Sequence, residues 1–136
     1  MYQTIVVPID IAQISRAPKM LDAARALLSE GGKIACLNVV QEIPGYVEME
    51  LSSELTPRLQ SEAREQIKTL LSDAGLEATV EVRSGHPSQT ILTFAEEVGA
   101  DLVVVGSHKP GLEDFFLGST ASRVVRHAKC HVLVQR

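Results

Sequence analysis

Residues 100–120 read Ala-Asp-Leu-Val-Val-Val-Gly-Ser-His-Lys-Pro-Gly-Leu-Glu-Asp-Phe-Phe-Leu-Gly-Ser-Thr, and this stretch decides the expected fold. The apolar run at 102–105 is typical of a buried strand, and it ends abruptly at Gly106. After a loop with basic, Pro and Gly residues, Gly-Ser-Thr at 118–120 opens an amphipathic segment. A strand, a glycine-flanked loop and a helix N-terminus are therefore predicted. Because the N–H groups at a helix start attract anions, this order indicates a phosphate site.

The chain on either side of this stretch alternates between strand-like and helix-like periods. Strands are predicted at residues 4–9, 33–40, 76–83, 102–105 and 131–135. Helices are predicted between them, the first capped by Ser15 and ended by the glycine pair at 31–32. Residues 41–54 have no clean period and are expected to form mainly a loop, after which Thr56 and Pro57 begin the next helix.

Five strands that alternate with helices imply a parallel sheet with right-handed crossovers and helices on both faces. The first and fourth strands are the most uniformly apolar and are expected at the centre, whereas the alternating third strand is expected at an edge. The predicted fold is α/β and Rossmann-like, with strand order 3-2-1-4-5 in a single domain of residues 1–136. Ligands bind such sheets beyond the carboxyl ends of the strands, at the switch point where Asp10 and Gly106 are expected.

Composition limits the classes of function. With 136 residues, 45% of them hydrophobic and 22% charged, the chain is ordinary for a globular domain. Its formal charge of -4 argues against nucleic acid as a partner, and its basic residues at 123–129 are expected to form a solvated helix face. No apolar run approaches the ~20 residues of a membrane span, and no signal-peptide pattern precedes the first strand, so a cytoplasmic location is expected. Cys36 and Cys130 lie in apolar runs and are expected to be buried thiols.

Familiar phosphate and catalytic motifs do not fit this sequence. Residues 106–111 match the first half of a P-loop, but Leu112 and Glu113 stand where that motif requires Lys and Ser or Thr. No Gly-x-Gly-x-x-Gly follows the first strand, and no nucleophile-elbow pattern is present for Ser/His/Asp hydrolysis. No catalytic residue is therefore predicted.

Five features carry a resemblance to a known family. They are Ile-Val-Val-Pro-Ile-Asp at 5–10, Leu-Asn-Val-Val at 37–40, Gly85 before the third predicted helix, Val-Val-Gly-Ser-His at 104–108 and the run at 117–134. The last of these, Leu-Gly-Ser-Thr-Ala-Ser-Arg-Val-Val-Arg-His-Ala-Lys-Cys-His-Val-Leu-Val, is the most specific. On these residues the chain resembles a universal stress protein of the short single-domain bacterial type, and the likeness covers its whole length.

ATP-binding members of that family have Gly, two residues, Gly, nine residues and then Gly-Ser or Gly-Thr. Here Gly106 matches the first glycine, Lys109 stands at the second, and eight residues rather than nine separate Lys109 from Gly118. A glycine at the second position would let the backbone approach a phosphate closely. The Lys109 ammonium and the flexible Gly111 are expected to compensate. In the alternative interpretation this shortened loop does not bind a nucleotide.

The resemblance implies ATP as the ligand, together with a set of nucleotide-binding residues. They are Pro8, Asp10, Val39, Gly106, Ser107, His108, Lys109, Gly118, Ser119 and Thr120. The first two would border ribose and adenine, Val39 would present its backbone to the base, and the glycine-containing segments would hold ribose and phosphates. Mg²⁺ is a further expected cofactor, held through water by Asp10. Simpler roles as turn cap, helix N-cap or exposed loop residue remain open for Asp10, Ser119, His108 and Lys109.

The function implied by the resemblance is that of a stress-related regulatory protein that binds ATP or another adenine nucleotide and acts on an unknown regulatory protein partner. Little or no ATP hydrolysis is expected, because no residue is an evident water-activating base. The last strand is apolar and lies at an edge, which invites pairing with its twin, so a homodimer through Val132 and Val134 is expected. The alternative is a dimeric interaction module of the same fold that binds no nucleotide.

Overall fold

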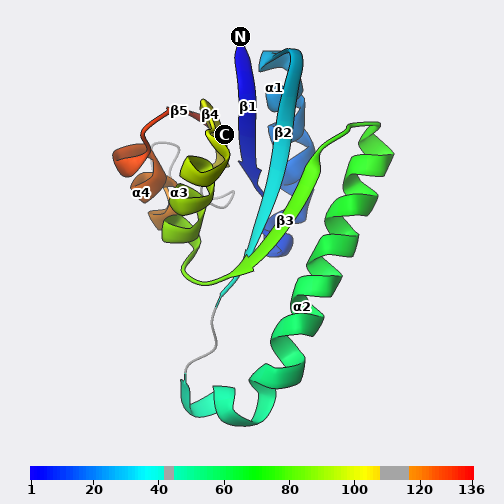
Figure 1. Cartoon of the computed structure of the whole chain (residues 1–136), viewed down its shortest axis with the longest axis vertical. Coiled ribbons are helices and arrows are strands. Elements are labelled where there is room, and N and C mark those ends of the chain that lie inside the picture. The colour runs from blue at the N-terminus through cyan, green and yellow to red at the C-terminus, as the bar shows by residue number, and fades with distance from the viewer. Residues whose placement is uncertain (42–44, 108–116) are drawn as a thin grey trace.

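The computed structural model describes residues 1–41, 45–107 and 117–136, and Figure 1 shows their arrangement around one sheet. The elements follow in the order β1 (Tyr2–Pro8), η1 (Ile11–Arg16), α1 (Ala17–Leu27), β2 (Leu28–Val40), α2 (Gly45–Ala74), β3 (Thr79–Ser84), α3 (Pro87–Val98), β4 (Leu102–Gly106), α4 (Ser119–His127) and β5 (His131–Gln135). The η1 element is a 3-10 helix. Among the residues described, no helix combines the length and the apolar character that crossing a bilayer requires.

The sheet has the predicted order β3-β2-β1-β4-β5, and all neighbouring strands are parallel. The centre of the sheet is buried on both faces. Successive side chains of a strand point to opposite sides, so each central strand contributes to two cores. Ile5 and Val7 of β1 pack in one core with α1 and α2, whereas Val6 packs in a second core with α3 and α4. Figure 1 shows these two helix pairs on opposite sides of the sheet, as the alternation of elements predicts.

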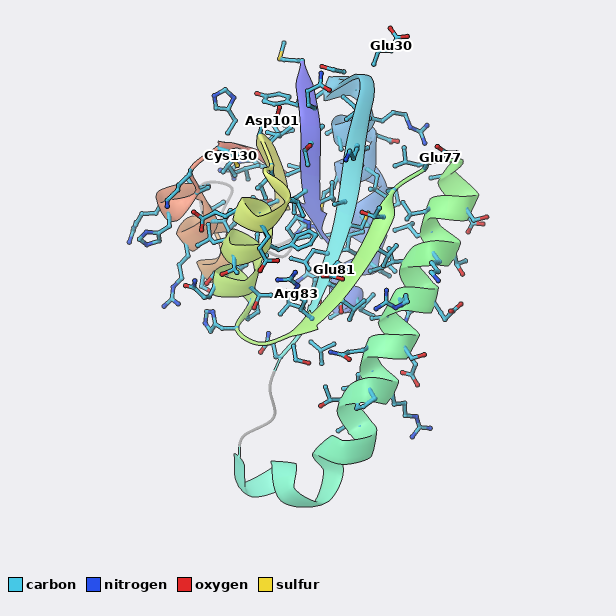
Figure 2. All side chains as sticks on the ribbon, in the orientation of Figure 1. Glu30, Glu77, Glu81, Arg83, Asp101 and Cys130 are labelled. Carbon is cyan, nitrogen blue, oxygen red and sulfur yellow. The ribbon has the colours of Figure 1, made fainter. Side chains whose placement is uncertain are left out.

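The two edge strands differ in how they are covered. At the β3 edge, the Arg83 guanidinium pairs with Glu81 at 3.0 Å and with Glu97 of α3 at 2.5 Å, and it lies 4.9 Å from the centre of the Phe94 ring. Figure 2 shows Glu81 and Arg83 near each other at this edge. Charged side chains of this kind hinder a further strand from pairing. The opposite edge, β5, carries the residues His-Val-Leu-Val-Gln.

The first helix ends earlier than predicted, at Leu27, and β2 already begins at Leu28. The predicted stop at residues 31–32 was wrong because both glycines belong to β2. Between its pairings Tyr2↔Leu28 and Thr4↔Lys33 the register with β1 shifts, so the glycines lie in an irregular part of the ladder. A Cβ at Gly32 would lie 3.0 Å from the Gln3 carbonyl oxygen, which explains why the smallest residue is needed there.

The long helix α2 begins at Gly45, so the prediction of a loop over 41–54 was wrong for residues 45–54. Pro57 lies inside this helix and does not mark its start. Figure 1 shows the first turns of α2 at an angle to the rest of the helix, as expected where a proline interrupts the backbone hydrogen bonds. A proline near an N-cap residue is an ambiguous signal, because it fits a first turn and also a kink.

Three smaller predictions also need correction. Ser15 lies within η1 and does not cap α1, whose N-cap residue Arg16 makes no side-chain capping bond. Cys36 is buried as predicted, but Cys130 is only half-buried. The strand predicted at 76–83 is Thr79–Ser84, and the one predicted at 4–9 is Tyr2–Pro8.

Candidate functional site

A pocket of about 300 Å³ opens at the carboxyl edge of the sheet, where β1 and β4 separate. This volume lies at the lower end of the range for small-molecule sites. The pocket is formed by the last residues of β1, β2 and β4, by residues that follow these strands, and by residues near the start of α1, α3 and α4. Its lining consists of Pro8, Ile9, Asp10, Gln13, Arg16, Ala17, Met20, Leu37, Val39, Gln41, Pro87, Ile91, Val105, Gly106, Ser107, Gly118, Ser119, Thr120 and Ala121.

The pocket brings together most of the residues that the sequence singled out. Those that line it are Pro8, Asp10, Val39, Gly106, Ser107, Gly118, Ser119 and Thr120. The topology explains this convergence, because strands on either side of the switch point lead their loops in opposite directions and leave a crevice between them. The predicted residues His108 and Lys109 lie outside the described residues, as does Gly111.

Asp10 has a structural role in addition to its place at the pocket. Its Oδ1 accepts a hydrogen bond from the Ala12 backbone N–H at 3.0 Å, which makes it the N-cap residue of η1. The backbone before it is fixed by β2, since the Asn38 side-chain amide donates to the Ile9 carbonyl oxygen at 2.8 Å. Asn38 is itself buried, so this contact holds the end of β1 in place. The capping role considered for Asp10 is thus confirmed.

The start of α4 supplies backbone donors to the pocket. Gly118 is the N-cap residue, so the alternative of Ser119 as the N-cap was wrong. Gly118 makes no side-chain cap, and its carbonyl oxygen accepts from the Ser122 N–H at 2.8 Å. The first N–H groups of a helix have no partner within the helix, and they carry a partial positive charge. Ser119 and Thr120 place their N–H groups and hydroxyls at this position, where hydrogen-bond acceptors are favoured.

The lining also contains a cation that the sequence analysis did not identify, Arg16. Its Nη1 donates to the Ser107 carbonyl oxygen and to Gln13 Oε1, the latter at 3.2 Å. Gln13 lines the pocket too, in a kink of η1 where its φ is -129° and its ψ is 37°. No motif includes either residue, because their position depends on the 3-10 turn that follows β1. The only available signal was their nearness to Asp10 in the chain.

One wall of the pocket is apolar. Leu37 and Val39 contribute from β2, and Pro87 and Ile91 from the start of α3. The charged and hydroxyl-bearing side chains of the lining come mainly from η1, the end of β4 and the start of α4. A cavity with these two sides suits a small molecule that has an apolar ring at one end and hydrogen-bond acceptors at the other.

A metal could be held here only in part by the protein. Within the described ranges, no group of three or more His, Cys, Asp or Glu side chains lies close enough together to hold a metal ion. Asp10 is the carboxylate among the described lining residues. One carboxylate together with waters and ligand phosphates is a common arrangement for Mg²⁺, so the residues present fit a phosphate-bound Mg²⁺ better than a metal held by protein alone.

Comparisons with known proteins agree with this architecture. The sequence model of the universal stress protein family matches residues 1–136. The chain is 34% identical over 145 residues to universal stress protein G of Escherichia coli O157:H7, with all of both chains covered. Among solved structures, protein MJ0577 of Methanocaldococcus jannaschii has a TM-score of 0.79 at 30% identity, covering 98% of this chain and 95% of that one. A universal stress protein solved in complex with cAMP has a TM-score of 0.63 at 26% identity, covering 99% and 97%. The chain therefore belongs to the universal stress protein family.

Proposed function

We propose that the carboxyl-edge pocket binds an adenine nucleotide, with ATP the expected ligand, and that the protein acts as a stress-related regulator. The observation that carries the proposal is the mixed lining of the pocket, which is mainly apolar from β2 and α3 and has its charged and hydroxyl-bearing side chains mainly from η1, β4 and α4. An adenine ring and a phosphate chain require these two environments at opposite ends. The related universal stress protein in complex with cAMP supports the same class of ligand.

The proposed pose follows from the lining. The base lies against Leu37 and Val39, and the ribose lies near Pro8 and Asp10. The phosphates lie toward the residues after β4 and toward the N-terminus of α4, where backbone N–H groups favour anions. Mg²⁺, when bound, neutralises phosphate charge, and Asp10 holds it through water.

A regulatory role is favoured over an enzymatic one. Asp10, the carboxylate of the described lining, already accepts the Ala12 N–H and caps η1, which does not suit it to activating a water molecule. Binding of the nucleotide is then the signal itself. Phosphate release from ATP, measured at saturating nucleotide, is expected to stay at the level of the buffer control.

Two measurements test nucleotide binding. Heat extraction of the purified protein is expected to release an adenine nucleotide, visible as a raised 260 to 280 nm absorbance ratio because the chain has no Trp and 2 Tyr. The stripped protein is expected to gain about 2.7 kcal/mol of stability with ATP at ~100 times its dissociation constant. A protein that releases no nucleotide and shows no thermal shift with ATP would leave the dimeric interaction module as its function.

The same proposal includes a homodimer formed through β5. Val132 and Val134 pack against the α3 and α4 core and are half-buried, and the outer edge of β5 offers backbone groups for pairing. Gln135 directs its backbone toward β4, since its carbonyl oxygen accepts from the Ser107 N–H at 2.9 Å. Because successive residues of a strand direct their backbone groups to alternate sides, the Val134 N–H faces the outer edge.

This geometry gives a sharper test than introducing charges at the two valines, which would disturb the core. Val134→Pro removes the outward N–H and spares the ladder with β4, whereas the matched control Val134→Ala keeps that N–H. The Pro variant is expected to have the mass of a monomer by light scattering, and the Ala variant that of a dimer. A Pro variant that remains dimeric would place the interface elsewhere.

A further inference from the structure

The pocket holds one charged side chain of each sign among its described lining residues, Asp10 and Arg16. Asp10 is committed to the turn at Ala12, as the cap of η1. Arg16 is the last residue of η1 and precedes the first residue of α1. It is half-buried, so its cationic group lies partly out of solvent at the polar side of the pocket.

Arg16 is held by Ser107, which is distant in sequence, and by Gln13 of its own turn. Its Nη1 donates to the Ser107 carbonyl oxygen, and its Nη2 lies 3.5 Å from Ser107 Oγ, across 91 positions of the chain. Ser107 is in turn fixed to β5, because its N–H donates to the Gln135 carbonyl oxygen at 2.9 Å. The same Nη1 also donates to Gln13 Oε1 at 3.2 Å. The cation is therefore placed at the end of β4 before any ligand enters.

A guanidinium in this position differs from a surface lysine in three ways. Its planar group presents several N–H donors in a fixed arrangement that matches the oxygens of a phosphate. Because neighbouring residues already orient it, little side-chain freedom is lost when an anion binds. Partial burial also reduces the screening of its charge by water and salt.

Resting on the proposed nucleotide site, we infer that Arg16 is the residue that recognises the phosphate group of the bound nucleotide. Arg16 contacts a phosphate oxygen and keeps the segment at Ser107 in position beneath it. The apolar wall from β2 and α3 binds the base without the aid of Arg16. The phosphate group then contributes to the affinity through the Arg16 side chain, in addition to its contacts with the backbone groups of the segments after β4.

The experiment compares the affinities of adenosine, AMP, ADP and ATP, measured by titration calorimetry for the wild-type protein and three variants. Arg16→Gln removes the charge and keeps an amide donor that can reach Ser107. Arg16→Lys keeps the charge and removes the planar fork. Lys19→Gln is the matched control, because it removes one positive charge from an exposed position of α1 outside the pocket lining.

Arg16→Gln is expected to weaken binding of the phosphate-bearing ligands about 10- to 100-fold and to leave adenosine nearly unchanged. Arg16→Lys is expected to fall between Arg16→Gln and the wild type, and Lys19→Gln is expected to match the wild type. Should Arg16→Gln fail to fold, the same selective loss in Arg16→Lys carries the inference.

The outcomes separate this inference from the proposed function. A wild-type protein that binds none of the four ligands overturns both. Wild-type binding of ATP that Arg16→Gln and Arg16→Lys leave unchanged overturns only the role of Arg16. An equal loss for adenosine and ATP also overturns it, because Arg16 would then act only as a support for the segment at Ser107.

Discussion

The two ends of the same parallel sheet use their polar side chains differently. At the amino end, the Asp101 carboxylate accepts the backbone N–H groups of Gln3 and Thr4, both at 2.9 Å, and the Tyr2 hydroxyl lies 2.8 Å from His131 Nδ1. Figure 2 shows Asp101 and Cys130 near each other at this end. At the carboxyl end, polar residues of η1, β4 and α4 surround a pocket. One end joins strands to one another, and the other forms the pocket proposed to bind a nucleotide.

The largest expected effect is on the labelling of two cysteines, one in the core beside the pocket and one at the amino end of the sheet. Burial raises the pKa of the Cys36 thiol to about 12, so this thiol reacts only when the protein opens. With ATP at ~100 times its dissociation constant, labelling of Cys36 by a thiol reagent is expected to slow about 100-fold, because opening must release the ligand.

Cys130 supplies the internal control for this labelling experiment. It is half-buried just before the edge strand β5, and burial, followed by the negative charge of Asp101, raises its pKa. Local fraying of an edge strand exposes such a thiol without opening the pocket. Its labelling, followed by mass spectrometry of the peptides, is expected to change little with ATP. Equal slowing at both thiols would show that the two ends open as one unit.

The second prediction concerns the space at the end of β4. A Cβ added at Gly106 would lie 3.4 Å from the Met20 sulfur, a contact that a flexible side chain tolerates. Gly106→Ala is therefore expected to bind nucleotide nearly as the wild type does. Gly106→Val adds two branches toward Met20 and the pocket, and is expected to weaken binding about 10- to 100-fold by calorimetry. Equal affinities for the two variants would contradict the proposed position of the ligand.

The third prediction tests the amino end alone. Burial raises the pKa of Asp101, but hydrogen bonds from the Gln3 and Thr4 N–H groups outweigh it and lower the pKa overall. A carboxyl group whose pKa is lowered on folding stabilises the fold above its ordinary pKa, and this contribution is lost as the pH falls through the folded-state value. Asp101→Asn is expected to cost about 1–2 kcal/mol at pH 7, since an amide has one acceptor oxygen for two donors.

Urea denaturation at pH 7 and at pH 3 measures this effect. The difference between wild type and Asp101→Asn is expected to narrow at the lower pH, where the carboxyl of the unfolded wild-type chain takes up its proton. Asp22→Asn, at an exposed position of α1, is the matched control for loss of one charge. A difference that is the same at both pH values would show that the carboxylate charge contributes nothing. Nucleotide affinity is expected to remain unchanged in both variants.

The sequence predicted the topology well, because the burial of a strand sets both the length of its apolar run and the spacing of its apolar residues. The uniformly apolar β1 and β4 could only be central, and the alternating β3 could only be at an edge. Local sequence signals for the ends of helices were less reliable where tertiary contacts determine those ends. The glycine pair at 31–32 looks like a helix stop, yet within β2 Gly31 has a φ of +80° and Gly32 lies close to Gln3. Pro57 looks like a helix start, yet it lies inside α2.

The site was predictable in its position and less so in its composition. Residues that directly follow strands, such as Asp10 and Gly106, converge wherever the strand order is known. Arg16 and Gln13 were missed because their contacts depend on a kinked 3-10 turn and on a partner across the sheet. Neither feature leaves a periodic pattern in the sequence. A structure is therefore needed to identify the side chains that reach a site from an irregular turn.

The smallest effect comes from the hydroxyl of Tyr2, which links β1 to the start of β5. Tyr2→Phe removes its hydrogen bond to His131 and keeps the edge-to-face ring contact, whose centroids lie 5.6 Å apart. The bond is exposed, so its loss is expected to cost about 0.5–1 kcal/mol in urea denaturation. ATP affinity is expected to match the wild type, because this contact and the pocket lie at opposite ends of the strands. A variant that lost affinity as Gly106→Val does would show that β4 and β5 transmit strain along their length, and the division of roles between the two ends would then be wrong.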